Sequence, residues 1–483
     1  MLAGGIMAGL GYIAMCIVLS HHWPPVLAAL AWFAVGHGSG WIYISTLFSN
    51  LKNFAPQERG PVVGAMACFF GSSAAINVAL LNGCIGGQVG ADKVCRHGFL
   101  GGNVVSYMAM LALVVPCVTV IGAMLTSVHE GHVPAAGDMA STRFNSLLAG
   151  ALTVVAFICG SNYYAMAVDA TIRQWSSIVL VALLSLFIFL PVGASPVDKF
   201  TNEVAAPDPK QATKDNGGPV HVPPPALGPH EAVRTIKFWA LFTAFGITVG
   251  ADIMTLNLLA SLVKSRGIMP MVTYFGVIVV MGSDTYLRFL SGFSVGKGVS
   301  PTGLLICGPI LMILGEVLLA SSHSVGTLYA ACVLVGASDG IMWGLGPLLS
   351  GMAFGLRSAG RNFGFVVMGA ACFTLLLSFG LEPTVYQAHT PPDAKVCTGH
   401  GCFGATLWAS AGLGLVGTAA AVVLHFQMRP SREPLLAKPA VDAERPEAEQ
   451  EEVIQTPENT TSLTEKEPML KERWPGDVAL RQR

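Results

Sequence analysis

A few ionisable side chains stand inside long apolar stretches of this 483-residue sequence: Asp252, Asp284, Arg288, Asp339 and His37. An ionisable group is costly to place in hydrocarbon, so each of them is a candidate for function. Three acids, one guanidinium and one imidazole suit proton coupling, ion binding or a charge latch between helices.

Asp252 and Asp339 lie near the middle of their apolar stretches, where a central cavity would be. Removal from water favours the neutral form of a carboxyl group, which suits these two acids to proton coupling or cation binding. The alternative is an acid that only hydrogen-bonds a neighbouring helix. Asn257 follows Asp252 closely and is a further candidate for the same cavity.

His37 lies within Gly36-His-Gly-Ser-Gly40 and has no bulky residue beside it. An imidazole there could bind substrate, relay a proton or ligate a metal. A structural histidine with satisfied hydrogen bonds is the other interpretation. Whether the chain holds a metal stays unknown from the sequence.

Asp284 and Arg288 are four residues apart, so they share one face of a helix and can neutralise each other. We expect this pair to form a gate, a charge latch towards the cytosolic end of its helix, with Arg59 and Arg357 of the cytosolic loops as further gating residues. Direct substrate contact and a purely structural pair are the alternatives.

The composition places these residues in a membrane. Hydrophobic residues make up 53% of the chain and charged residues only 11%, against about 25% charged in soluble proteins. Apolar runs of about 20 residues recur, each long enough to cross about 30 Å of hydrocarbon as a helix. The fold class predicted is all-α, a polytopic transmembrane helical bundle. The twelve candidate spans are 1–20, 26–48, 61–84, 103–127, 146–167, 177–194, 238–262, 270–292, 303–321, 325–350, 363–384 and 404–427.

The spans group into five segments. These are an N-terminal transmembrane bundle (1–127), a loop with an additional helix pair (128–194), a polar Pro- and Gly-containing linker (195–236), a C-terminal six-helix bundle (237–427) and a charged tail expected to be disordered (428–483). The bias of Lys and Arg among the loops places the linker and the tail in the cytosol. The plasma membrane and an organelle membrane are equally compatible with this multi-pass protein.

Two cysteine pairs lie in or beside loops on the side of the membrane opposite to the cytosol, where disulfides can persist. They are Cys84 with Cys95 and Cys397 with Cys402. A rival interpretation of Cys397-x-x-His400-x-Cys402 is a metal site with three ligands.

Several function classes are disfavoured. The net charge of −1 does not indicate nucleic-acid binding, and no P-loop, Gly-x-Ser-x-Gly or His-Glu-x-x-His motif occurs, so we expect no enzyme and no cofactor. The expected partners are the lipid bilayer and a small-molecule or ion substrate. The oligomeric state is unknown.

Two joints between spans resemble each other. One runs from Phe54 through Arg59 and Gly60 to Gly64, and the other runs from Phe354 through Arg357 and Gly360 to Gly364. The second joint connects the fourth and fifth spans of its bundle. If the first does the same, the first span of the chain is the third helix of its bundle, two helices are absent at the N-terminus, and spans five and six are an inserted pair.

The residues of this repeat resemble the nodulin-like branch of the major facilitator superfamily (MFS). The most specific element is Asn53-Phe54-x-Pro56-x-x-Arg59-Gly60, followed by Gly71-Ser-Ser-Ala-Ala-Ile76. Further matching blocks stand in the same order, namely Gly11-Tyr12, Phe238-Trp239-Ala-Leu-Phe242, Asn257-Leu258, Arg288-Phe-Leu-Ser-Gly292 and Phe354-Gly-Leu-Arg-Ser-Ala-Gly360. The chain departs from the family at Met352, where an acid is usual, at His37, and in having no match to the opening helices.

The resemblance implies a secondary transporter that works by alternating access. It implies monocarboxylate-like organic anions or iron as the substrate. The three acids and His37 led us to expect iron, another cation or proton coupling first, with an organic anion as the alternative. A receptor or scaffold that does not transport is the alternative of another class.

Overall fold

The structure is a computed structural model in which the chain divides into two units, Met1–Arg429 and Pro430–Arg483. It describes residues 1–126 apart from 53, 55–57 and 85–103, isolated positions between 149 and 179, and residues 227–429 apart from 270, 322–323 and 395. The predicted helix pair, most of the linker and the tail lie outside the described residues.

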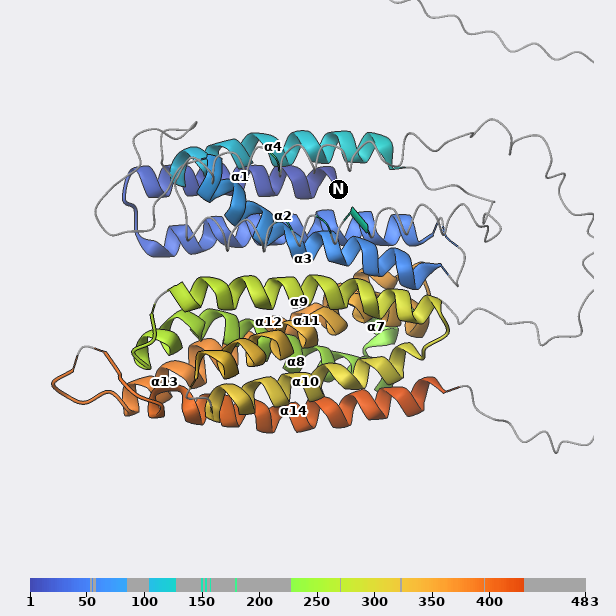
Figure 1. Cartoon of the computed structure of the whole chain (residues 1–483). Helices are drawn as coiled ribbons and strands as arrows, with labels where there is room; N and C mark the ends of the chain where they lie inside the picture. Colours follow the sequence, from blue (N-terminus) through green and yellow to red (C-terminus); the bar gives the residue numbers. More distant parts are fainter. Residues whose placement is uncertain are drawn as a thin grey trace, which may run out of the picture. The chain divides into compact units, whose positions relative to one another are not determined.

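Every regular element in the described part of the chain is a helix, apart from turns and bends (Figure 1). The helices are α1 (Leu2–Ser20), α2 (Pro25–Leu51), α3 (Arg59–Cys84), α4 (Val104–Leu125), α7 (Pro229–Ala232), α8 (Ile236–Ser265), α9 (Met271–Gly296), α10 (Pro301–Ser321), α11 (Val325–Phe354), α12 (Ala359–Leu375), η3 (Leu376–Leu381), α13 (Glu382–Ala388) and α14 (Gly401–Met428).

Among the described residues, 8 helical segments are long and apolar enough to cross a membrane. The predicted class, an all-helical protein with several membrane spans, is therefore confirmed. The helices α3 and α9 coincide with two more of the predicted spans. The predicted spans 146–167 and 177–194 lie almost wholly outside the described residues.

The two longest helices begin and end at residues suited to those positions. Thr235 and Ser324 accept a hydrogen bond from the backbone N–H three residues on, and so cap the starts of α8 and α11. The helix α11 ends at Gly355, whose φ of 79° is a conformation that favours glycine. These caps define two 30-residue helices, which carry Asp252 and Asp339.

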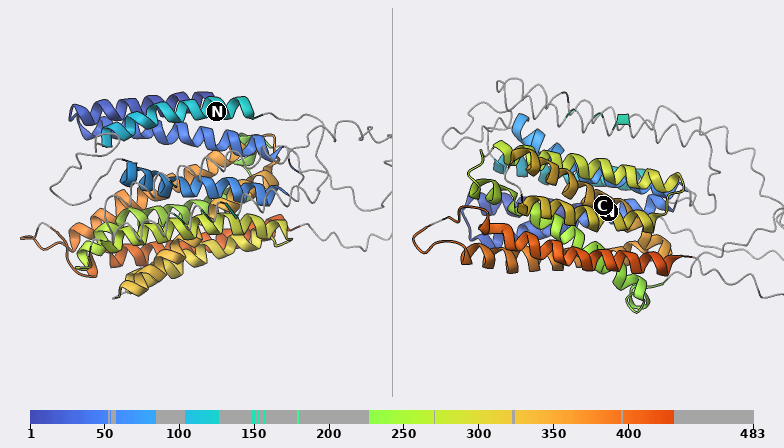
Figure 2. Two further views of the ribbon diagram at one scale, coloured as in Figure 1. Left: turned by 45° about the horizontal axis from the view of Figure 1, so that its top comes forward. Right: turned by 60° about the horizontal axis from the view of Figure 1, so that its bottom comes forward.

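The helix α9 lies between α3 and α11 and packs along both (Figure 1). The helix α8 packs against α12 and α14, and α10 packs against α11 and α14 (Figure 2). Side chains of α2 and α3, among them Leu47 and Val63, join the apolar core formed by α8, α11 and α12. The N-terminal and C-terminal helices therefore share a core along α3 and α9.

One packing pattern occurs twice. The helix α1 packs against α2 and α4, just as α10 packs against α11 and α14. Small residues make both contacts close: a Cβ on Gly11 would meet Val35 and Ala31 of α2, and one on Gly315 would meet Val335 and Ala331 of α11. The order of contacts in α1–α4 thus matches the order in α10, α11, α12 and α14.

Candidate functional site

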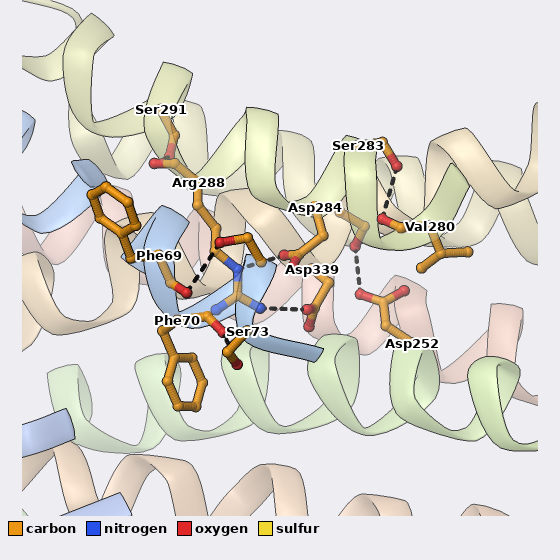
Figure 3. Close-up of polar contacts among 12 residues, drawn as sticks. Phe69, Phe70, Ser73, Asp252, Val280, Ser283, Asp284, Arg288, Ser291 and Asp339 are labelled. Carbon is orange, nitrogen blue, oxygen red and sulfur yellow. Dashed lines mark hydrogen bonds and ion pairs between the residues drawn. The ribbon is translucent and has the colours of Figure 1, made fainter. Parts of the chain in front are cut away.

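The most densely charged place in the described structure surrounds Arg288 (Figure 3). Its Nε donates to Asp284 Oδ1 at 2.6 Å, and its Nη2 donates to Asp339 Oδ2 at 2.9 Å. The side chains of Arg288, Asp284 and Asp339 are 5%, 3% and 13% exposed. We call these three residues the Arg288 cluster.

The cluster joins residues that were predicted to lie in different sites. Asp284 and Arg288 are predicted as a charge latch towards one end of their helix and Asp339 as part of a central cavity, whereas the structure brings all three together. Asp284 lies near the middle of α9, so the predicted position towards the helix end is wrong. The role of the pair as a gate stays a prediction.

Glycines on both sides of α9 make room for the cluster. A Cβ on Gly71 of α3 would lie 2.7 Å from Asp284 Oδ2 and 2.9 Å from Arg288 Nε, too close for any side chain without a shift. On the other side, a Cβ on Gly340 of α11 would lie 3.0 Å from the Arg288 backbone nitrogen. Close approach of α3 and α11 through these glycines is what buries Arg288.

Aromatic rings surround the guanidinium. Its carbon lies 5.8 Å from the Phe70 ring centre and 5.4 Å from that of Trp343, within the range of cation–π attraction. Tyr43 of α2 stacks on Phe70 at 4.4 Å, and Phe245 of α8 packs edgewise on Trp343 at 5.2 Å. Since Phe70 is 37% exposed, this aromatic wall extends from the buried charges to accessible surface.

Several polar atoms of this site are buried without a hydrogen-bond partner among the described residues: Arg288 Nη1, Asp339 Oδ1 and the Tyr43 hydroxyl. Buried polar groups are nearly always paired, so leftover donors and acceptors at one place need an explanation. The guanidinium Nη1 can only donate, the phenol can donate or accept, and the carboxylate accepts. Together they offer a ligand one cationic donor, one hydroxyl and one acceptor.

Asp252 is connected to the cluster through α11. Its Oδ2 accepts a hydrogen bond from Ser338 Oγ at 2.9 Å, and Ser338 directly precedes Asp339. The other carboxyl oxygen, Oδ1, is buried and has no partner in the described residues. The two acids predicted for the central cavity, Asp252 and Asp339, are thus linked through Ser338, and Asp252 lies next to the Arg288 cluster.

The remaining predicted residues lie elsewhere. His37 is exposed on α2, with its ring 5.4 Å from that of Phe33 and 5.2 Å from that of Trp41. Asn257 is exposed on α8. Arg59 donates to the carbonyl of Phe54 within its own joint, and Arg357 is exposed. In the described structure, none of these four forms a hydrogen bond or an ion pair with the Arg288 cluster. The predicted cavity role of His37 and Asn257 and the predicted gating role of Arg59 and Arg357 stay predictions.

The second cysteine pair forms a disulfide. Cys397, in the loop before α14, is bonded to Cys402 in the first turn of α14, and the N–H of Gly399 donates to the carbonyl of Ser265 at the end of α8. The bond occupies both sulfurs, which excludes the rival metal site with His400. Cys95 lies outside the described residues, so its pairing with Cys84 stays a prediction.

Metal ligation has no geometric support in the part of the chain that the structure describes. No group of three or more His, Cys, Asp or Glu side chains is arranged there to hold a metal ion. The two acids that the structure brings together, Asp284 and Asp339, already have Arg288 as their cation.

One buried acid was overlooked in the sequence. Glu316 lies inside the apolar run of α10 and is fully buried, and its Oε1 accepts hydrogen bonds from Ser410 Oγ at 2.9 Å and from Thr255 Oγ1 at 3.3 Å. The rule that singled out Asp252, an acid within a membrane span, applies equally to Glu316. The signal was therefore present in the sequence.

Comparison with known proteins adds no assignment. No protein-family model matches the chain, and no curated protein matches it.

Proposed function

We propose that the protein is a proton-coupled secondary transporter of a small organic anion, of the major facilitator type, in which Arg288 binds the substrate carboxylate. The observation that carries this proposal is the buried guanidinium with one free amino group, held by two exchangeable carboxylates between aromatic walls. A planar guanidinium is the side chain best suited to bind a carboxylate through two parallel hydrogen bonds.

The charges favour an anion over the iron or other cation expected first. A cation needs free carboxylates, but Asp284 and Asp339 are both paired with Arg288. An anion needs a free cationic donor, and Arg288 Nη1 is available. The cavity for a metal would also need ligands that the described residues do not bring together.

The same charges supply proton coupling. With all groups ionised, one Arg and two Asp carry a net charge of −1, which is costly in a buried site. One proton makes the cluster neutral. When a substrate carboxylate replaces Asp339 on Arg288, a proton that enters with it and binds the released Asp339 carboxyl leaves the net charge of the site unchanged. Asp339 is the more exposed of the two acids, which favours it as the partner that leaves.

The position of the cluster suits alternating access. Its walls come from α2 and α3 of the N-terminal half and from α9 and α11 of the C-terminal half. In transporters of this kind, the substrate site lies at the interface between two bundles that rock against each other. The repeated packing of α1 with α2 and α4 supports the proposal that α1 is the third helix of its bundle.

Uptake by the purified protein in liposomes tests the proposal. A panel of labelled monocarboxylates, divalent metals and amino acids would be offered with and without an inward proton gradient. We expect gradient-dependent uptake of a monocarboxylate by the wild type and none by Arg288→Gln. Arg234→Gln removes an exposed arginine far from the cluster in sequence and serves as the matched control. Flux of a metal or amino acid alone, or no flux of any solute, would contradict the proposal.

The same assay separates a transporter from a receptor or scaffold. A receptor or scaffold that does not transport should keep its function when the charges of the Arg288 cluster are removed. A transporter should lose flux in Arg288→Gln. The double variant Arg288→Gln with Asp284→Asn should also lack flux, while its expression level and its thermal unfolding temperature stay close to those of the wild type. The paired change removes the unpaired buried charge that the single variant leaves behind.

A further inference from the structure

Glu316 forms a polar site of its own, separate from the Arg288 cluster. Its carboxyl contacts hydroxyls from two neighbouring helices, Thr255 of α8 and Ser410 of α14. Both donate to the same oxygen, Oε1, while Oε2 is buried and without a partner among the described residues. One turn before Ser410, Thr406 is fully buried and its hydroxyl is also unpaired there.

In the part of the chain that the structure describes, Glu316 forms no ion pair: the two ion pairs seen there join Arg288 to Asp284 and to Asp339. The contacts of the Glu316 carboxyl are the two hydroxyls. The nearest arginine along α8, Arg266, directs its Nη2 to the carbonyl of Leu319, one turn further along α10. A carboxylate is expensive to bury without a counter-ion, whereas a protonated carboxyl with hydroxyl neighbours is not. The surroundings of Glu316 are those of a proton-binding group.

The face of α8 connects Glu316 to the Arg288 cluster. Thr255, which touches Glu316, lies three residues after Asp252, so both point from the same side of the helix. Asp252 in turn accepts the hydrogen bond of Ser338, which directly precedes Asp339. Figure 3 shows Asp252 beside the cluster, with a hydrogen bond from α11 reaching its carboxyl. The acids therefore form a series, Glu316, Asp252 and Asp339, that crosses the C-terminal helices.

The series also runs along the helices. Glu316 lies five residues before the end of α10 at Ser321, at the end of the bundle where the loop with the Cys397–Cys402 disulfide contacts Ser265. Asp252 and Asp339 lie near the middle of their helices. Glu316 is thus displaced from the cluster towards the disulfide end.

We propose that Glu316 is a second proton-binding residue of the transport cycle, which loads Asp252 and through it the Arg288 cluster from the disulfide end of the bundle. This inference rests on the proposed function, because it assigns the source of the coupling proton. Asp252 gives its proton to Asp339, whose carboxyl leaves Arg288 as a substrate carboxylate takes the guanidinium. The Glu316 carboxyl then passes its own proton to Asp252 and is briefly a carboxylate held by Thr255 and Ser410. Glu316 takes up a new proton from the disulfide end, which restores the starting state of Glu316 and Asp252. The charged groups bonded to the series in the described residues are Asp284 and Arg288 of α9, and Arg266 at the end of α8 donates to Leu319, one turn after Glu316.

Glu316→Gln separates coupling from substrate binding. In liposomes we expect this variant to keep exchange of labelled for unlabelled substrate without a proton gradient. It should lose uphill accumulation driven by the gradient and lose the substrate-dependent proton influx reported by an entrapped pH dye. Thr255→Val, which keeps the carboxyl but removes the hydroxyl on α8, should slow proton influx and leave exchange intact.

Three results would overturn the inference. Gradient-driven accumulation at the wild-type rate in Glu316→Gln would show that the proton does not use this residue. Loss of exchange together with accumulation, in variants that unfold at the wild-type temperature, would place Glu316 in substrate binding or packing instead. Unchanged proton influx in Thr255→Val would exclude the link along α8, and this variant answers the question even if Glu316→Gln fails to fold.

Infrared difference spectra test the proton site without any substrate. A protonated buried carboxyl has its own C=O stretching band, and part of that band should disappear in Glu316→Gln but remain in Glu382→Gln, a control on α13. A band that is unchanged in Glu316→Gln would overturn the inference. If the wild type transports no solute but the band depends on Glu316, the proposed substrate transport fails while the proton site stands.

Discussion

Arg288 of α9 donates to Asp339 of α11 across a helix boundary, with 2.9 Å between Nη2 and Oδ2. The same guanidinium holds Asp284 within its own helix at 2.6 Å. The first bond joins two helices and can break when they move, whereas the second depends on α9 alone. The two acids should therefore behave differently when each is neutralised.

Asp339→Asn should uncouple transport from protons. The asparagine keeps the shape and a hydrogen bond to Arg288 but cannot exchange a proton, so we expect exchange to survive and pH-dependent accumulation to disappear. The wild type should accumulate more substrate as the external pH falls, because the proton is a co-substrate, and Asp339→Asn should show no such dependence. Uptake measured at several external pH values checks this. A variant that still accumulates substrate in a pH-dependent way would assign the proton to another acid.

Asp284→Asn should weaken the structure more than Asp339→Asn does. Asp284 is the more buried acid and has the shorter bond to Arg288, so its loss leaves the guanidinium with a single carboxylate. Removing one partner of a buried pair costs roughly 3–5 kcal/mol. Thermal unfolding of both variants in the same detergent gives the comparison. Equal losses of stability would contradict the distinction drawn between the two bonds.

The charged residues of the cluster could be identified from the sequence, but the contacts between them could not be predicted. Insertion cost alone marked Asp252, Asp284, Arg288 and Asp339. Which of them touch depends on the faces on which α9 and α11 meet. That choice depends on glycines such as Gly340, whose role is visible only when the opposing backbone of Arg288 is known.

The glycines around His37 show the same limit. A Cβ on Gly36 or Gly40 would meet nothing within 4 Å. Close packing on α2 occurs at Gly38, on the opposite side, where a Cβ would meet Ala8 of α1. Three glycines in a row of five residues do not reveal which face of the helix is packed. The overall class, by contrast, needed only the length and apolar character of the spans.

The two joints offer a matched pair of glycine substitutions. A Cβ on Gly64 would lie 2.9 Å from the Phe289 carbonyl oxygen and 3.0 Å from that of Arg288, which are backbone atoms that cannot rotate away. The corresponding Gly364 has nothing within 4 Å. Gly64→Ala should therefore lower stability by roughly 1–3 kcal/mol through overpacking, whereas Gly364→Ala should be neutral or slightly stabilising because alanine favours a helix. Thermal unfolding of the two variants, side by side, measures the difference. Equal effects would argue against the close contact of α3 with α9.

The disulfide should stabilise the disulfide end of the bundle by a modest amount. It closes a loop with a sequence separation of only 5 residues, for which the chain-entropy estimate is about 2 kcal/mol. The paired variant Cys397→Ser with Cys402→Ser should unfold at a lower temperature than the wild type. Reducing agent should lower the unfolding temperature of the wild type towards that of the variant and leave the variant unchanged.

Because the loop contacts Ser265 at the end of α8, exchange of backbone amide hydrogens should increase most at that end of α8 and at the start of α14. A wild type that is insensitive to reductant, with the thiols shown to be free, would contradict a stabilising role for this bond.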